Sequence, residues 1–167
     1  TRFLFLILYF RSPEYFYNLS RSISYFVRHR VFNITEVQTH KILKNQYIEL
    51  INFILMPNHF HLLVRECQEK GISRYMQRVL NAYTKYFNTK YEKSGHLFQG
   101  PFQIVHIKNG EQLLHLSAYI HRNAREIKEW KNKEEKYPWS SYRDYISKNR
   151  WVGILKTDLI LNQWSAI

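Results

Sequence analysis

Residues 47–65, with the sequence YIELINFILMPNHFHLLVR, decide the fold because they hold two apolar runs separated by a turn signal. The first run, Tyr47–Met56, is rich in Ile, Leu and Phe and ends at Pro57-Asn58. The second run, His59–Arg65, follows at once. Two such runs joined by a tight turn predict a β-hairpin. Both are apolar enough to be central strands of a sheet.

The chain after the hairpin alternates between helix and strand patterns. Apolar residues recur at helical spacing across Gly71–Lys93, which predicts a long amphipathic helix. Phe102–Ile107 alternates between apolar and polar residues and lies between turn signals, so we expect a strand. Glu111–Ala124 is expected to form a second helix. This order predicts an α+β sandwich with an antiparallel or mixed sheet and helices on one face.

The first 46 residues give weaker patterns. Ser12-Pro13-Glu14 has the character of a helix start, and apolar residues follow it at roughly helical spacing as far as Val27. A second short helix is expected at Thr35–Leu43, with Thr35 as its N-cap. The apolar run Phe3–Phe10 is far shorter than the ~20 residues of a membrane helix, so we expect a buried strand or helix there and no membrane segment. We expect one domain over residues 1–167 with a core at about 47–146, and residues 1–46 are atypical.

The charge balance favours a polyanionic partner. The 167 residues include 25 Lys and Arg against 13 Asp and Glu, which gives a formal net charge of +12. A surplus of this size creates a positive surface field, although a merely soluble basic protein would show it too. The single cysteine, Cys67, excludes an intramolecular disulfide framework and a Cys-rich zinc site, and it suits a reducing cytoplasm.

His59 and His61 are candidate metal ligands. Residues i and i+2 of a strand share one face, and their Cα atoms lie ~6.5–7 Å apart. Two imidazoles at this spacing can converge on one ion at ~2.0–2.1 Å from each nitrogen, while Phe60 points into the core. The alternative is a pair of histidines on an exposed strand face, which is common.

Tyr119 and Asn123 form a second candidate pair on the helix expected at 111–124. Their spacing of four places them on one helix face, which His115 and Arg122 flank. An amide oxygen from Asn123 suits a hard divalent ion such as Mg²⁺ or Mn²⁺, and the Tyr119 hydroxyl would lie near that ion. The alternative is that this tyrosine only packs and this asparagine is solvated.

Four ordered segments carry a family resemblance. Leu55–Val64 resembles the signature strand of the REP-associated tyrosine transposases and their insertion-sequence relatives, members of the HUH (His-hydrophobic-His) superfamily. Tyr83–Asn88 through Gly95–Phe102 resembles the helix-to-strand passage of that family. Tyr119–Asn123 resembles its catalytic-helix motif, and Trp139–Tyr142 resembles a common C-terminal element. Together these segments span residues 50–146.

The resemblance implies a metal-dependent single-strand DNA endonuclease and strand transferase that forms a 5′-phosphotyrosine intermediate. It implies that Tyr119 is the nucleophile and that His59, His61 and Asn123 bind the Mg²⁺ or Mn²⁺ ion. It also implies single-stranded or hairpin DNA as partner, a monomer or homodimer, and the cytoplasm of a prokaryotic cell with its nucleoid. The family usually has Pro after the asparagine, where this chain has Ala124.

The implied fold is a ferredoxin-like sandwich with a central antiparallel sheet of four to five strands and helices on one face. Its first strand would fall within Phe3–Phe10 or Tyr15–Asn18.

Basic residues are candidates for a DNA phosphate track, and neighbouring aromatic rings are candidates for stacking on unpaired bases. The alternative for each is a solvated helix face. Two rival functions also remain at this point: an inactive relative that binds DNA or RNA hairpins, and a metal-dependent hydrolase that uses water. The candidate DNA-binding residues are Lys85, Lys90, Lys93, Lys108, Arg122 and Arg125.

Overall fold

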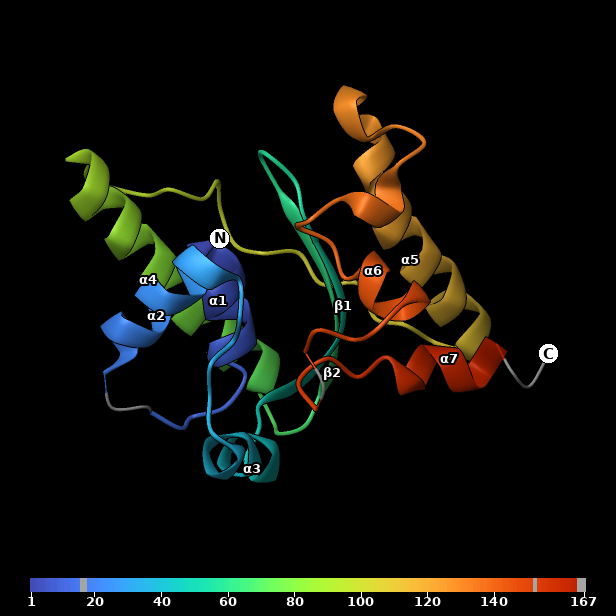
Figure 1. Ribbon diagram of the computed structural model, residues 1–167, viewed down its shortest axis with the longest axis horizontal. Coiled ribbons are helices and arrows are strands. Elements are labelled where there is room, and N and C mark those ends of the chain that lie inside the picture. The colour runs from blue at the N-terminus through green and yellow to red at the C-terminus, as the bar shows by residue number, and fades with distance from the viewer. Residues whose placement is uncertain (16–17, 152, 165–167) are drawn as a thin grey trace. The chain divides into compact units, whose positions relative to one another are not determined.

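The computed structural model describes residues 1–15, 18–151 and 153–164. It has a mixed α/β fold in which the described residues form seven α-helices and one two-stranded antiparallel sheet (Figure 1). The chain divides into two compact units. Unit 1 is formed by residues 1–48 and 66–105, and unit 2 by residues 49–65 and 106–167. The expected single domain over the whole chain stays a prediction.

Unit 1 is helical. Its helices are α1 (Arg2–Tyr9), α2 (Leu19–His29), α3 (Glu36–Lys44) and α4 (Gly71–Tyr91). Helix α1 packs against α2 and α4, and its residues 4–9 are all buried. The expectation of a long helix at Gly71–Lys93 is confirmed by α4 to within two residues.

Two expectations for the N-terminal region are wrong. Phe3–Phe10 does not contain the first strand of the implied sheet, because the run lies in α1. The buried helix, which was the other expectation for this run, is confirmed. A continuous apolar run suits a fully buried helix as well as a buried strand, and the packing of the neighbouring helices decides between them. The other placement, Tyr15–Asn18, includes residues 16 and 17, which lie outside the described part of the chain. No helix begins at Ser12, whose hydroxyl accepts from the Glu14 N–H at 3.2 Å and so forms a local turn.

The expected N-cap at Thr35 is confirmed. The Thr35 hydroxyl accepts from the Gln38 backbone N–H at 3.2 Å, and the Gln38 side-chain oxygen accepts from the Thr35 N–H at 2.9 Å. This reciprocal pair is a capping box, which satisfies two of the N–H groups that a helix start leaves unpaired. Helix α3 therefore begins where the local sequence predicts.

Unit 2 is built on the predicted hairpin. Strand β1 spans Ile48–Leu55 and strand β2 spans Phe60–Glu66. The Met56 N–H donates to the His59 carbonyl at 2.8 Å and closes the turn between them. Strand β1 is buried along almost its whole length, as expected of a central strand, whereas β2 is mostly half-buried or exposed and does not meet the same expectation.

The expected sheet of four to five strands is not confirmed, because the described residues form two strands and two isolated bridges. The bridges pair Ile54 with Ser140 in antiparallel fashion and Leu50 with Leu155 in parallel fashion. The strand expected at Phe102–Ile107 is wrong, since these residues are irregular. Alternation specifies which side chains share a face, but a strand also needs a neighbour with unpaired backbone groups.

Three helices complete unit 2: α5 (Gly110–Arg122), α6 (Tyr142–Ile146) and α7 (Asp158–Trp164). The expected second helix is confirmed by α5, which packs with α7 (Figure 1). After α5 the chain continues as three short 3₁₀ helices, η1 (Asn123–Glu126), η2 (Lys128–Trp130) and η3 (Glu134–Lys136). None of the described helices has the length and apolarity needed to cross a membrane. The core of unit 2 contains Ile51, Ile54, Leu63, Ile120, Ala124, Tyr137 and Ile160.

Candidate functional site

The two histidines of the hairpin lie together in unit 2. His61 is on β2, and His59 precedes that strand by one residue. Their ring centroids are 5.0 Å apart, with an interplanar angle of 80°. His59 is exposed and His61 is half-buried. The i, i+2 spacing therefore brings the two rings to the same side of the strand.

The hydrogen bond of His59 assigns its tautomer. Its Nδ1 lies 2.7 Å from the side-chain oxygen of Asn58. An amide oxygen only accepts hydrogen bonds, so Nδ1 carries the proton in this contact. With Nδ1 as the donor, Nε2 is the ring nitrogen that would bind a metal ion.

His61 is held in the neutral form by its surroundings. Burial lowers the pKa of His61 from 6.5, and the nearby His59 ring lowers it further because a proton on one ring repels a proton on the other. The Glu126 carboxylate acts in the opposite direction and raises that pKa. Because the net shift is downward, His61 is neutral at pH 7, as a metal-binding imidazole must be.

Tyr119 is brought to His61 by the packing of α5 in unit 2. Its ring centroid lies 5.9 Å from that of His61, at an interplanar angle of 68°. The Tyr119 side chain is 54% exposed, so its hydroxyl is not in the core. A large substrate can therefore reach this phenol while it lies beside an imidazole.

Asn123 is joined to this group through the backbone of Tyr119. Its side-chain Nδ2 donates to the Tyr119 carbonyl at 2.7 Å, one helical turn earlier. This bond uses the amide nitrogen and leaves the amide oxygen as an acceptor or ligand. Asn123 is only 3% exposed, whereas Tyr119 and His59 are open to solvent. Asn123 is therefore the most enclosed of the four predicted site residues.

Glu126 is a site neighbour that the sequence reasoning missed. It lies on η1, is exposed, and acts electrostatically on His61. The available signal was its spacing, because Tyr119, Asn123 and Glu126 stand at i, i+4 and i+7. Within the described part of the chain, however, no three His, Cys, Asp or Glu residues are grouped so that they could hold a metal ion. The donors available here are two imidazoles and the amide of Asn123.

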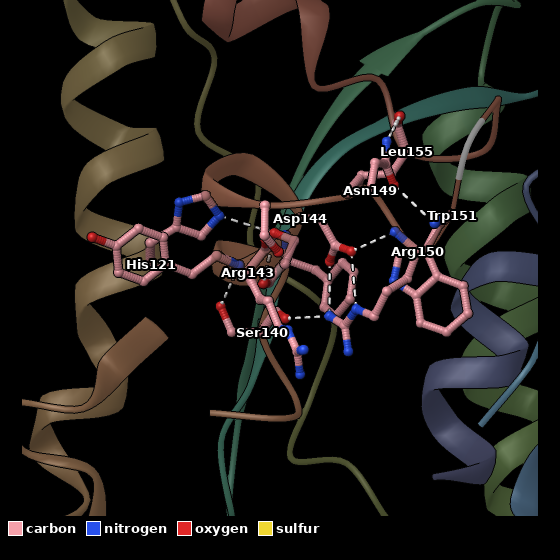
Figure 2. A network of polar contacts seen from close by, with 12 residues as sticks. His121, Ser140, Arg143, Asp144, Asn149, Arg150, Trp151 and Leu155 are labelled. Carbon is pink, nitrogen blue, oxygen red and sulfur yellow. Dashed lines mark hydrogen bonds and ion pairs between the residues drawn. The ribbon is translucent and has the colours of Figure 1, made fainter. Parts of the chain in front are cut away.

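His121 is a second residue that the sequence reasoning did not use. It is buried on α5, and burial lowers its pKa to about 4. Its Nε2 lies 2.9 Å from the hydroxyl of Ser141, in the segment that resembled a C-terminal family element. The ring also stacks on Tyr142, with centroids 5.1 Å apart and 10° between the planes. Figure 2 shows this ring within a wider polar network.

The six basic residues predicted to bind DNA are all exposed, and they fall in both units. Lys85 and Lys90 are on α4 and Lys93 follows it closely. Lys90 lies 5.0 Å from the ring centroid of Tyr91. A cation beside an exposed aromatic ring suits phosphate and base contacts, although an ordinary surface shows the same pairing. Unit 1 contains Lys85, Lys90 and Lys93, and unit 2 contains Lys108, Arg122 and Arg125.

Comparison with known proteins identifies the family. The model of the family described as transposase IS200 like matches residues 23–123, which is more than half of the chain. The matched region contains His59, His61, Tyr119 and Asn123. No curated protein and no solved structure match the chain. The geometry of unit 2 and this match lead to one conclusion: the chain belongs to the IS200-like transposases, whose substrate is DNA.

Proposed function

We propose that this transposase nicks and rejoins single-stranded DNA, and that Tyr119 is its nucleophile. The observation that carries the proposal is the exposed Tyr119 ring 5.9 Å from His61, whose own ring lies 5.0 Å from that of His59. An exposed phenol beside two imidazoles is a suitable arrangement for attack on a phosphodiester.

In the proposed reaction, the Tyr119 oxygen attacks phosphorus and the 3′ oxygen of the preceding nucleotide leaves. One P–O bond forms as another breaks, and the phenol proton is in effect transferred to the departing 3′ oxygen. The product is a 5′-phosphotyrosine and a free 3′-hydroxyl. Because the covalent link conserves the phosphodiester energy, a second 3′-hydroxyl can reverse the step and join a new strand without a nucleotide cofactor.

The residues present fit a divalent metal ion. The Nε2 of His59 is the ring nitrogen that would bind the ion, His61 is neutral, and the Asn123 amide keeps its oxygen because its nitrogen is already bonded. We propose His59, His61 and Asn123 as ligands of Mg²⁺ or Mn²⁺, and the amide oxygen of Asn123 is the donor type that such hard ions prefer. When bound, the ion would polarise the scissile phosphate and stabilise developing negative charge.

The proposal extends to the DNA that is bound. We expect single-stranded or hairpin DNA, with the six exposed basic residues contacting phosphates and neighbouring rings stacking on unpaired bases. A homodimer is compatible with this proposal. We also keep, as a proposal, the ferredoxin-like fold with a sheet of four to five strands that the family resemblance implies.

A covalent-adduct assay tests the proposal. Wild-type protein, incubated with a labelled hairpin oligonucleotide and Mg²⁺ or Mn²⁺, is expected to give a protein–DNA band on a denaturing gel. Tyr119→Phe should abolish that band and leave DNA binding nearly intact. Tyr25→Phe, an exposed tyrosine on α2, is the matched control and should behave as wild type. An adduct formed by Tyr119→Phe would refute the assignment of the nucleophile.

One observation favours a second candidate, an inactive relative that only binds hairpin DNA or RNA. Asn123 is only 3% exposed and bonds the backbone of its own helix, so it can serve packing without any metal ion. The same gel distinguishes the functions, because a binder gives neither cleavage nor adduct. A water-using hydrolase gives cleavage without adduct. His61→Ala should remove metal-dependent cleavage if the proposed ligands are correct.

A further inference from the structure

Two buried residues of α5 lie on the helix face opposite Tyr119. Ser117 and His121 are two residues before and two residues after it, and both are buried. A step of two residues turns an α-helix by about 200°, so these side chains share one face while Tyr119 points the other way. Contacts on this inner face therefore set where the phenol lies on the outer face.

The first contact joins Ser117 to β1. Asn52 is fully buried on that strand. Its Nδ2 donates to the Ser117 hydroxyl at 2.9 Å and lies 3.3 Å from the Ser117 carbonyl. The Asn52 Oδ1 is buried and makes no hydrogen bond within the described part of the chain. An apolar side chain would avoid that unsatisfied group, so stability alone does not favour asparagine here.

The second contact joins His121 to β1 through Ser141. The Ser141 hydroxyl accepts from the Phe53 N–H at 2.9 Å and donates to the Phe53 carbonyl at 3.2 Å. A serine has one O–H and two acceptor positions, so its remaining position accepts from His121 Nε2–H at 2.9 Å. The Ser141 backbone N–H also donates to the Phe53 carbonyl, at 3.0 Å. Every hydrogen-bonding position of this hydroxyl is used.

Ser141 is itself held by a buried ion pair. Arg150 donates to both oxygens of Asp144, at 2.9 and 2.7 Å, and also to the Ser140 carbonyl at 2.9 Å. The Asp144 N–H donates to the Ser141 carbonyl at 2.9 Å. In Figure 2 dashed lines join the Arg150 side chain to Asp144 and Ser140, and His121 lies on the side away from Arg150. The segment that receives His121 is therefore fixed at several points.

Both contacts end on β1, the strand that pairs with β2. His61 is on β2, so His61 and Tyr119 are both positioned relative to β1. Hydrogen bonds restrict angle as well as distance, whereas apolar contacts let a helix shift along its axis. We infer that Asn52 and Ser141, through Ser117 and His121, are positioning residues that fix α5 on β1 and so set the distance between the Tyr119 hydroxyl and the two histidines.

This inference rests on the proposed function of Tyr119. The test uses the full chain with Asn52→Leu and Ser141→Ala, and with Ser147→Ala as the matched control. Ser147 is exposed and its hydroxyl donates only to the nearby Arg143 carbonyl, at 2.9 Å. Three quantities are measured: the single-turnover rate of adduct formation at saturating oligonucleotide with Mg²⁺, the Kd for the same oligonucleotide, and the urea midpoint of unfolding.

We expect the rate to fall at least tenfold and up to about a hundredfold in Asn52→Leu and Ser141→Ala, because a misplacement of about 1 Å can slow catalysis by about 10². The Kd should stay within about twofold, since neither residue contacts DNA in the proposal. Asn52→Leu should keep its urea midpoint, because the substitution also removes the unsatisfied Oδ1. Ser147→Ala should match wild type in all three quantities.

The remaining outcomes refute either the proposed function or the inference about positioning. If wild type forms no adduct, the proposed function fails, and this inference fails with it. If wild type forms adduct and Asn52→Leu forms it equally fast, the inference alone is overturned. If in Asn52→Leu the rate falls, the Kd rises and the urea midpoint falls together, Asn52 has only a structural role and the inference is likewise overturned.

Discussion

Replacing Arg150 by alanine should destabilise the chain far more than replacing its partner Asp144. The two side chains form a two-point ion pair, but they differ in their access to water. The side chain of Asp144 is 0% exposed, whereas that of Arg150 is 31% exposed. Arg150→Ala therefore leaves a carboxylate buried without its counter-ion, whereas Asp144→Ala leaves a guanidinium that can still be hydrated.

The magnitude follows from this asymmetry. Removing one partner of a buried pair costs roughly 3–5 kcal/mol, and partial exposure of the pair places Arg150→Ala near 3 kcal/mol. Asp144→Ala should cost about 1–2 kcal/mol, for the hydrogen bonds that are lost. In a chain of this size each kcal/mol shifts the Tm by about 2–4 °C, so Arg150→Ala should lower it by about 6–12 °C.

Urea and thermal unfolding followed by circular dichroism measure both variants. The double variant Arg150→Ala/Asp144→Asn provides the decisive comparison, because it removes the stranded charge and keeps the shape of the side chain. It should be more stable than Arg150→Ala alone. Equal losses in the two single variants, or no recovery in the double variant, would refute the reasoning.

Three further predictions concern local features. Thr35→Ala removes one half of the capping box with Gln38, so α3 should lose about 1 kcal/mol, measured by urea unfolding. Gly71→Ala should destabilise by about 1–3 kcal/mol, because the new Cβ would clash with the Tyr47 carbonyl; a wild-type Tm would contradict this. Burial lowers the pKa of His121 to about 4, so below pH 6.5 the unfolded state binds a proton that the folded state does not. The free energy of unfolding should therefore fall by up to about 3 kcal/mol from pH 6.5 to pH 4. His121→Phe should show a smaller fall over the same pH range.

Local patterns predicted the elements whose cause is local. The hairpin, α4, α5 and the capped start of α3 all follow from periodicity, turn residues and one N-cap. Each of these signals concerns neighbouring residues, so the rest of the fold has little power to override it. The element boundaries agree with the expectations to within a few residues for the same reason.

The two strands that were expected but not found show where local patterns stop predicting structure. Phe3–Phe10 is apolar on all sides, which cannot distinguish a buried helix from a buried strand, and its packing among helices decided for α1. Phe102–Ile107 has the alternation of a strand but no ladder partner among the described residues. The backbone of Phe53 and Leu55 on β1 is instead bonded to the segment 139–141.

In the candidate site, too, local spacing predicted some features and tertiary packing decided the others. Spacing alone paired His59 with His61 and Tyr119 with Asn123, because i, i+2 on a strand and i, i+4 on a helix each define a face. Spacing does not say that the two pairs meet, and that expectation came from the family resemblance. Glu126 was missed because it lies on η1, after the end of α5, and its electrostatic effect on His61 depends on tertiary packing.

The sequence by itself determined the family, the hairpin and the main helices, because short-range patterns along the chain encode them, and it supplied the four candidate residues of the proposed chemistry. Only the tertiary structure decided that the Tyr119 ring lies beside that of His61, and that Ser117 and His121 tie α5 to β1. The physical reason is that a hydrogen bond between Asn52 and Ser117, 65 residues apart, leaves no periodic trace in the sequence. Such contacts depend on the complete packing of helix against strand, and that packing places the phenol.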